Sequence, residues 1–547
     1  MNKRKDYISH IPLLIYFLLV SFVLMLLCTR SSFLYPYNNW DDANSYLTMG
    51  KSMMHGIRIY RDIFDQKGPW LYFLYGLCSL VSRTSFKGVF IMEILWGVFD
   101  LCCMYRILRL FMKKETAVFL LPVLFAVSYS SWAFYWGGSA EELCLPFMLL
   151  PLFYLLRHYK TRPSGPVPAG EVFISGLCCG VTAGIKFTLL GFYFAFMLMV
   201  LFSCLAAEKS GEGMVPGLIG GTEGAKAAGE GSAAGNRFAR AVSLFLKDCG
   251  IFLLAMALPF VPWIIFFIAT GTLDDFYRVY IYTNVFLYSS FGANDKGESL
   301  YDRVYNLAKL LYWLIWDNLQ FFLFIITGFF YMLFRKNSGF LLRIVCPVLF
   351  FFTFLGIYVG GAHLPYYALP LTVFAAAGFI LAGRLIEPAV TACCAKLKSL
   401  SKGQVLYVFP ALSLCVSILL AYRFSANSFY LSFDKEDVFL TSFAEDIRRD
   451  NLPEPTLLNY NCFDCGLYTV ADIYPTCYWF QTQTLPVSDI LDEQYRFIRE
   501  GITDYVVTRD NFTDLLYEKY EMIDSFHQII GPDGWEFDYY LFRRKDL

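Results

Sequence analysis

Apolar segments long enough to cross a membrane recur along most of this chain. A helix needs about 20 predominantly apolar residues to span a bilayer, and such segments recur from Ile11 almost to Tyr422. Only 17% of the 547 residues are charged, whereas 57% are hydrophobic. So few charges over this length exclude an ordinary soluble globular protein. The sequence therefore predicts a multispanning α-helical membrane protein.

The lengths of the apolar segments predict about 11 spans, with an upper limit of about 13. The predicted spans cover residues 11–28, 88–110, 116–133, 141–157, 171–185, 188–206, 247–268, 315–334, 341–359, 366–384 and 404–422. Residues 70–83 are too short for a span and are predicted to form a helix lying partly in the membrane near its outer face.

The distribution of basic residues predicts the orientation in the plasma membrane. Lysine and arginine are enriched in cytoplasmic loops. The basic clusters are Arg106, Arg109, Lys113 and Lys114; Arg157, Lys160 and Arg162; Arg335, Lys336 and Arg343; Lys396, Lys398 and Lys402. All of them fall on the cytoplasmic side when the N-terminus is cytoplasmic. The first apolar segment is too long for a signal peptide and has no cleavage site, so it is predicted to be a retained span.

Two stretches are predicted to lie outside the membrane part, which covers residues 1–422. The Gly- and Ala-rich residues 209–236 predict a flexible linker within a cytoplasmic connection at 207–246. Residues 423–547 alternate apolar and polar runs and predict a small extracytoplasmic α/β domain, which places the C-terminus outside. In that domain Cys462, Cys465 and Cys477 favour a disulfide over a metal site, because no second C-x2-C pair is present.

Charged residues gather in the loops that this topology places outside. The stretch NWDDANSYLTMGKSMMHGIRIYRDIFDQKGPW belongs to the predicted first outer loop, residues 29–87. The residues concerned are Asp41, Asp42, Arg58, Arg61, Asp62, Asp65 and Lys67 in that loop, Glu141, Glu142 and Lys186 at two later turns, and His363, Tyr366 and Tyr367 at another. Each alone is explained by solvation, snorkelling or an interfacial aromatic belt. Their convergence on one membrane face favours a functional site, because ionisable residues at a span's edge are costly without a role or a partner.

This set of residue types suits group transfer from a lipid phosphate. A carboxylate near the membrane surface can accept the proton of an acceptor hydroxyl. Lysine and arginine stabilise the negative charge that develops on a departing phosphate. Tyrosine and tryptophan suit sugar rings and the headgroup boundary.

The chain resembles the polyprenyl-phosphate-sugar-dependent glycosyltransferases of the GT-C fold, which include protein O-mannosyltransferases and aminoarabinose transferases. It looks closest to a poorly characterised bacterial branch of that superfamily. The matching motifs are Asp42-Ala43-Asn44, Gly50-Lys51 and Tyr60-Arg61-Asp62-Ile63-Phe64-Asp65-Gln66-Lys67-Gly68-Pro69, with Gly137-Gly138-Ser139-Ala140-Glu141-Glu142 and His363-Leu364-Pro365-Tyr366-Tyr367 as support. The resemblance covers the whole membrane region, whereas the C-terminal domain matches in general character only.

The resemblance implies a GT-C fold and a single displacement with inversion. It implies an acidic catalytic base in the first outer loop, and the spacing to Tyr46 ranks Asp42 above Asp41. The better-known members carry Asp-Glu where this chain has Asp-Asp. It also implies that Lys67 meets the lipid-linked phosphate. The other candidates for donor phosphate or substrate binding are Arg58, Arg61, Lys186, Glu141, Glu142, His363, Tyr366 and Tyr367.

The predicted partners are a polyprenyl-phosphate sugar donor, membrane lipids, and an acceptor that is a cell-envelope glycan, a lipid-linked glycan or a protein. No nucleic acid, cofactor or metal ligand set is predicted, and a divalent metal stays open. A lipid-linked sugar transporter or flippase is the main alternative, although such proteins usually carry mid-membrane charges and paired halves. A non-catalytic envelope-assembly protein is the second alternative, but it would not need acids and a lysine aligned in one loop.

Overall fold

The computed structural model describes residues 2–210, 230–288, 299–336, 338–361, 363–397, 405–484, 489–530, 534 and 536–547. Helices dominate up to residue 424, and a small sheet follows. The helices of the apolar part are α1 (Asn2–Cys28), α4 (Lys87–Phe111), α5 (Lys114–Tyr129), α6 (Ala140–Thr161), α7 (Ala169–Ala183), α8 (Leu190–Ser210), α9 (Glu230–Ala257), α10 (Val261–Ala269), α13 (Leu300–Asp317), α14 (Leu319–Leu333), α15 (Phe340–Tyr358), α16 (Ala376–Leu397) and α17 (Val405–Phe424). Short 3-10 helices join several of them: η1 (Trp132–Phe134), η2 (Phe187–Leu189), η3 (Leu258–Phe260) and η5 (Pro365–Ala375).

Five helical stretches of the described residues are long and apolar enough to cross a bilayer, and two sharply bent helix pairs would raise that number to seven. The five are Lys87–Phe111, Phe187–Glu208, Arg237–Ala269, Phe340–Tyr358 and Pro365–Cys393. The prediction of a multispanning helical membrane protein is therefore confirmed in its coarse form. Fewer segments qualify than the sequence predicts, partly because α5 and α7 have only 16 and 15 residues, short of the about 20 that a straight span needs.

The predicted span over residues 315–334 is wrong as a single helix. The chain bends by 112° between α13 and α14, at Asn318. The Asn318 side chain accepts a hydrogen bond from the Ala133 backbone N–H at 3.0 Å and donates one to the Leu314 carbonyl at 3.3 Å. Asparagine side chains that bond to backbone groups in this way compete with the helix and end it.

The flexible linker predicted over 209–236 is also wrong at both ends. Helix α8 continues to Ser210 and α9 begins at Glu230, so residues 209–210 and 230–236 of the predicted linker are helical. The rest of that prediction, residues 211–229, lies outside the described residues, as do Lys398 and Lys402 of the last basic cluster.

The loop of residues 29–87 contains two helices, α2 (Asp41–Met54) and α3 (Pro69–Ser79). They pack closely: a Cβ added at Gly50 would lie 2.6 Å from the Tyr72 carbonyl oxygen, so only glycine fits there. Helix α3 matches the helix predicted over residues 70–83. After α10 the chain continues through α11 (Leu273–Phe276) into the π-helical segment η4 (Tyr277–Tyr288).

The part of the chain that follows α17, called the C-terminal domain below, contains a four-stranded sheet with the order β1-β2-β4-β3. Strands β1 (Leu457–Asn459) and β2 (Tyr505–Arg509) are parallel, whereas β4 (Glu536–Arg544) is antiparallel to both β2 and β3 (Tyr520–Ile529). Its helices are η6 (Ala426–Ser432), η7 (Lys435–Asp437), α18 (Phe439–Arg449), α19 (Leu467–Val470), α20 (Asp489–Glu500) and α21 (Leu516–Lys519). Parallel β1 and β2 are joined through α19 and α20, as an α/β unit requires.

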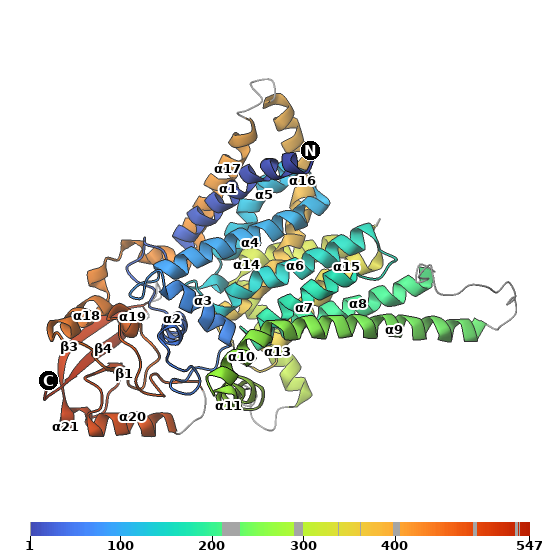
Figure 1. Cartoon of the computed structure of the whole chain (residues 1–547). Coiled ribbons are helices and arrows are strands. Elements are labelled where there is room, and N and C mark those ends of the chain that lie inside the picture. The colour runs from blue at the N-terminus through green and yellow to red at the C-terminus, as the bar shows by residue number, and fades with distance from the viewer. Residues whose placement is uncertain are drawn as a thin grey trace.

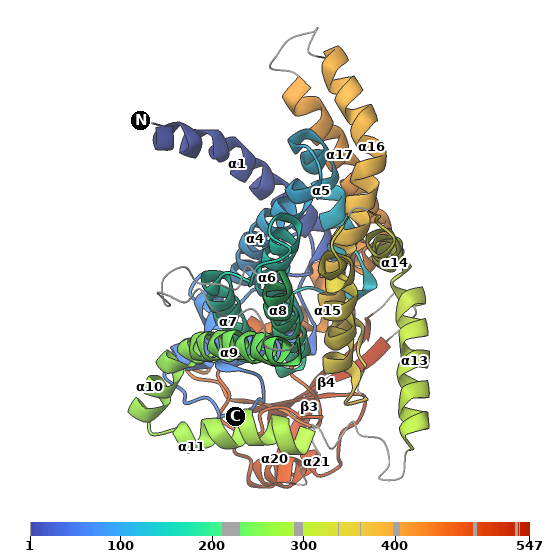
Figure 2. The same cartoon turned by 90° about the vertical axis from the view of Figure 1, so that its right-hand side faces the viewer.

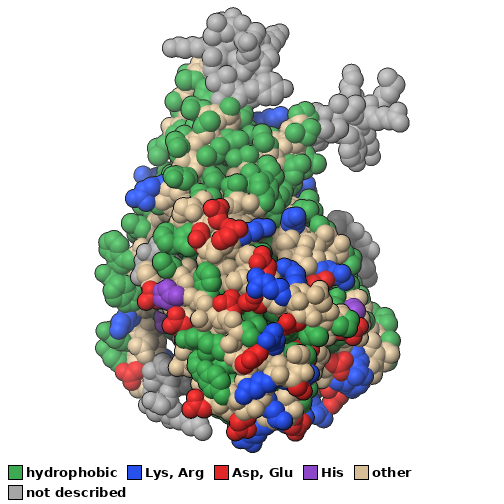
Figure 3. All heavy atoms as spheres, turned by 90° about the vertical axis from the view of Figure 1, so that its left-hand side faces the viewer, with side chains coloured by type: hydrophobic (Ala, Val, Ile, Leu, Met, Phe, Trp, Pro, Cys, Tyr) green, Lys and Arg blue, Asp and Glu red, His purple; other side chains and the backbone are tan. Residues whose placement is uncertain are grey.

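The sheet lies at the end of the molecule opposite α16 and α17. Figure 1 shows the sheet at the lower left, next to α2 and α3. Figure 2 shows α16 and α17 extending away from it at the top. On the face in Figure 3, apolar side chains cover most of the upper part, and acidic and basic side chains gather in the lower part. This division agrees with a membrane part and a water-exposed domain.

The disulfide predicted among Cys462, Cys465 and Cys477 is not formed, because all three are free thiols. The Cys462 and Cys465 thiols interact with each other, and each of the three sulfurs also has another partner. Cys462 donates to the Val507 carbonyl and Cys465 to Asn459 Oδ1, both at 3.8 Å, and Cys477 lies 3.6 Å from Glu493 Oε1. The three thiols are buried.

Candidate active site

Helix α2 places the two adjacent acids, Asp41 and Asp42, in its first turn. Carboxylates at a helix N-terminus are stabilised by the partial positive charge of the unpaired backbone N–H groups. Successive residues of a helix point about 100° apart, so the two side chains leave α2 in different directions. They therefore meet different parts of the protein.

Asp42 accepts two phenol hydrogen bonds on the same oxygen. Tyr46, one turn further along α2, donates to Asp42 Oδ2 at 3.0 Å, and Tyr366 of η5 donates to it at 2.8 Å. Among the described residues, none donates a hydrogen bond to Oδ1. The half-buried carboxylate is thus held in a fixed orientation with one oxygen available to accept a proton.

Asp41 instead forms an ion pair with the C-terminal domain. Arg509 Nη1, at the end of β2, lies 3.1 Å from Asp41 Oδ2 and 3.3 Å from Oδ1. Burial raises the pKa of Asp41, and the Arg509 guanidinium counteracts only part of that rise. Asp41 therefore forms an ion pair, whereas Asp42 forms none with a described residue.

Three further contacts on the same face fasten α2 to the C-terminal domain. Ser45 donates to Gln481 at 2.6 Å, Thr48 donates to Asp464 at 2.6 Å, and Lys51 donates to the Tyr468 carbonyl at 2.9 Å. The C-terminal domain thus fixes the helix that carries Asp42.

A cavity of about 440 Å³ is lined by Tyr367, the neighbour of the Tyr366 phenol that bonds to Asp42, although no residue of α2 lines it. It contains four of the predicted site residues, namely Lys67, Lys186, His363 and Tyr367. Apolar side chains complete its walls: Ile185, Phe187, Ile357, Val359 and Leu364. A cavity with cations and apolar walls can accept an anionic head joined to an apolar chain.

Lys67 is held in this cavity by its backbone. Its N–H donates to the Tyr72 hydroxyl at 2.9 Å, and its carbonyl accepts from the Tyr60 hydroxyl at 2.7 Å. Gly68 follows, and a side chain there would collide with the Gly184 carbonyl. Glycine is therefore required for the close approach that positions Lys67.

The charges around Lys67 keep it protonated. Burial lowers the pKa of its ammonium, but the negative charges of Asp42 and Asp65 outweigh this and the pKa lies above its ordinary value. Lys186 and Tyr367 also act on the same ammonium, so these groups are close to one another. Asp65 is itself buried and accepts a hydrogen bond from the Tyr72 hydroxyl at 2.8 Å.

Lys186 differs from Lys67 because it already has a carboxylate partner. Its ammonium forms an ion pair with Glu141 of α6, and both side chains are buried. It also lies over the Tyr367 ring, 4.1 Å from the ring centroid. Within the described residues Lys67 forms no ion pair, so it is the cation more available to a ligand.

The structure does not bring every predicted binding residue to the cavity. Arg58 pairs with Asp62 at 2.8 Å and Arg61 with Asp275 at 2.7 Å, both at the surface. Glu142 is fully buried and accepts a hydrogen bond from the Gly138 N–H at 2.9 Å. These three have structural partners instead.

Two groups at the site were not predicted from the sequence. Gln66 lines the cavity, and its buried Oε1 accepts no hydrogen bond from a described residue. Its position beside Lys67 in the motif is a signal that could have identified it. Arg509 gave no such signal, because 468 residues separate it from Asp41.

The described residues contain no group of three or more histidine, cysteine, aspartate or glutamate side chains that could hold a metal ion. The site is instead made of one available carboxylate, two lysines and several phenols. It can accept a proton and bind an anion.

No family model matches this sequence, and no curated protein matches it. The chain is similar in structure to ArnT from Cupriavidus metallidurans. For ArnT bound to undecaprenyl phosphate the TM-score is 0.57 at 12% identity, covering 97% of this chain and 98% of ArnT. For ArnT in the apo state it is 0.55 at 12% identity, covering 98% of each chain. The chain therefore has the GT-C fold that the sequence motifs predict.

Proposed function

We propose that this chain is an integral membrane glycosyltransferase that moves a sugar from a polyprenyl-phosphate donor to an acceptor outside the cytoplasm. The observation that carries the proposal is the available oxygen of Asp42, whose negative charge acts on Lys67, together with the cavity that Lys67 and Lys186 line between apolar walls. The structure of ArnT bound to undecaprenyl phosphate, a protein of the same fold, supports a polyprenyl-phosphate ligand.

In this proposal Asp42 is the general base. Its oxygen accepts the proton of an acceptor hydroxyl while that hydroxyl oxygen bonds to the anomeric carbon of the sugar. The bond between that carbon and the phosphate oxygen breaks, and its electron pair stays on the phosphate. Lys67 and Lys186 stabilise the negative charge that develops there. Attack from the side opposite the phosphate inverts the anomeric configuration.

The acceptor is a cell-envelope glycan, a lipid-linked glycan or a protein. Purified protein in vesicles that contain a polyprenyl-phosphate sugar tests the reaction, because transfer consumes the donor and releases polyprenyl phosphate. Movement of intact donor across the vesicle membrane without consumption would instead establish a flippase. Lipid analysis of a strain lacking the protein would identify the donor by its accumulation.

We place the site outside the cytoplasm, with about 11 spans, a cytoplasmic N-terminus and an extracytoplasmic C-terminal domain. Reporter fusions after Arg157 and at Leu547 are expected to report opposite sides of the plasma membrane. Fusions that report the same side would contradict this topology, and with it the shared outer location of Asp42 and Lys67.

Asp41 is expected to hold the helix in place rather than act on substrate. Arg509→Gln leaves a partly buried carboxylate unpaired, which should lower the free energy of unfolding by about 1–3 kcal/mol. Adding Asp41→Asn to this variant removes the unpaired charge, so the double variant should be more stable than Arg509→Gln alone. Thermal unfolding of the four proteins measures the coupling, and strictly additive losses would contradict the ion pair.

A further inference from the structure

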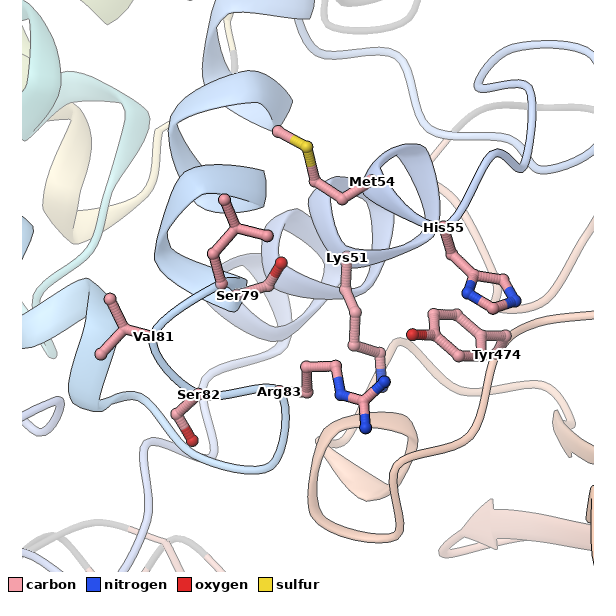
Figure 4. Close-up of a pocket in the computed structure, with 9 residues that line it drawn as sticks. Lys51, Met54, His55, Ser79, Val81, Ser82, Arg83 and Tyr474 are labelled. Carbon is pink, nitrogen blue, oxygen red and sulfur yellow. The ribbon is translucent and has the colours of Figure 1, made fainter.

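A second pocket lies where the loop of residues 29–87 meets the C-terminal domain. Its volume is about 370 Å³. Figure 4 shows the end of α2 and the end of α3 on one side and Tyr474 of the C-terminal domain on the other. The lining residues are Lys51, Met54, His55, Ser79, Leu80, Val81, Ser82, Arg83 and Tyr474.

Two cations share one carboxylate in this pocket. Lys51 Nζ lies 3.4 Å from Asp472 Oδ1, and Arg83 Nη2 lies 3.2 Å from Asp472 Oδ2. In Figure 4 the Lys51 and Arg83 side chains point toward one another. Asp472 contacts both cations and Asp464 also acts on Lys51, so Arg83 is the cation with donor groups left for a ligand.

Lys51 and Arg83 differ in exposure and in the partners that they already have. The Lys51 side chain is only 1% exposed, and its ammonium donates to the Tyr468 carbonyl at 2.9 Å in addition to its contact with Asp472. Burial lowers the pKa of Lys51 to about 8, although Asp472 and Asp464 oppose that change. The Lys51–Asp472 ion pair alone is enough to connect the loop of residues 29–87 to the C-terminal domain, so Arg83 is not needed for that contact. Arg83 adds a guanidinium that is 59% exposed and has further N–H groups to donate.

The pocket is separate from the donor cavity. Lys51 follows Asp42 by nine residues, which places it about 13 Å along α2 and half a turn away from it. The two pockets have no lining residue in common. A ligand in this pocket therefore has a different position from the proposed sugar donor.

We propose that this pocket binds the phosphate group of an anionic membrane lipid, as a second phosphate site independent of the transfer reaction. Arg83 and Lys51 supply charge-assisted donors to the phosphate oxygens. Leu80 and Val81, at the edge of the pocket, are 70% and 59% exposed, and they are suited to contact the acyl chains of such a lipid. A soluble phosphate would make the polar contacts but would leave this apolar edge in water.

The test uses the full-length protein carrying Lys67→Met, so that the donor cavity lacks its available cation. Isothermal titration calorimetry in neutral detergent compares dihexanoyl phosphatidylglycerol, dihexanoyl phosphatidylcholine and glycerol 3-phosphate. Arg83→Gln is expected to weaken phosphatidylglycerol binding about tenfold, the effect typical of one charged hydrogen bond. Arg449→Gln is the matched control, because Arg449 is 72% exposed, pairs with Asp446 and lies on α18 of the C-terminal domain.

Phosphatidylglycerol that binds more tightly than both other probes, with a loss in Arg83→Gln and none in the control, would support a lipid site. Equal binding of glycerol 3-phosphate would support the phosphate site and overturn the lipid as its source. No binding of either anion, or the same loss in both variants, would overturn the proposal. Because no transfer is measured, its failure is distinguishable from failure of the glycosyltransferase proposal.

Discussion

Replacing Asp42 by asparagine is expected to lower turnover by about 10²- to 10⁴-fold, the range typical for loss of a general base. An amide keeps the shape of the carboxylate and can still accept hydrogen bonds from Tyr46 and Tyr366. It cannot take up the proton of the acceptor hydroxyl at neutral pH. Steady-state assays with a purified polyprenyl-phosphate sugar measure the loss, and a separate titration should show that the donor still binds.

Asp41→Asn is the matched control for this prediction. It makes the same replacement of a carboxylate by an amide at the adjacent residue. Asp41, however, pairs with Arg509 and has no proposed contact with substrate. Its effect on turnover should be much smaller. If both variants retain near-normal transfer, neither acid is the base and the assignment of this site is wrong.

Removing the Lys67 ammonium is expected to weaken donor binding and to slow transfer together. The charge acts on the phosphate before the reaction and again as negative charge develops on it, so Lys67→Met should lower kcat/KM by about 100-fold or more. Methionine keeps most of the length of the apolar stem and removes the ammonium with its charge and N–H donors. Measurements of the donor dissociation constant and of single-turnover rates separate the two effects.

The control for Lys67 is Lys87→Met, because Lys87 belongs to the same loop and is exposed at the start of α4. It should leave both quantities unchanged. Normal donor binding in Lys67→Met would show that another cation, such as Lys186, holds the phosphate instead.

The sequence predicts the helical membrane fold well because its signals are local. Apolar length marks the helices, and one short motif contains Asp65, Gln66 and Lys67. The break at Asn318 is not predictable in this way, since the hydropathy of residues 315–334 is that of an unbroken span. It depends on a hydrogen bond to Ala133, which lies 185 residues earlier.

In the candidate site too, contacts between residues distant in sequence could not be predicted. Charge and loop position group Lys67, Lys186 and His363 correctly in one cavity. They also suggest Arg58 and Arg61, whose aspartate partners at the surface become visible only in the structure. The sequence distinguishes the two adjacent acids only by the spacing of Asp42 to Tyr46, and the folded chain adds that Arg509 pairs with Asp41.

The hydrogen bonds between α2 and the C-terminal domain have a consequence for biosynthesis. Thr48 emerges from the ribosome early, whereas its partner Asp464 is synthesised 416 residues later. At about 5–20 residues per second, this interval is roughly 20–80 s. During that time the nascent chain holds Asp42 on a helix that lacks its later contacts, so a partly made protein, already inserted in the membrane, would not yet have a finished site.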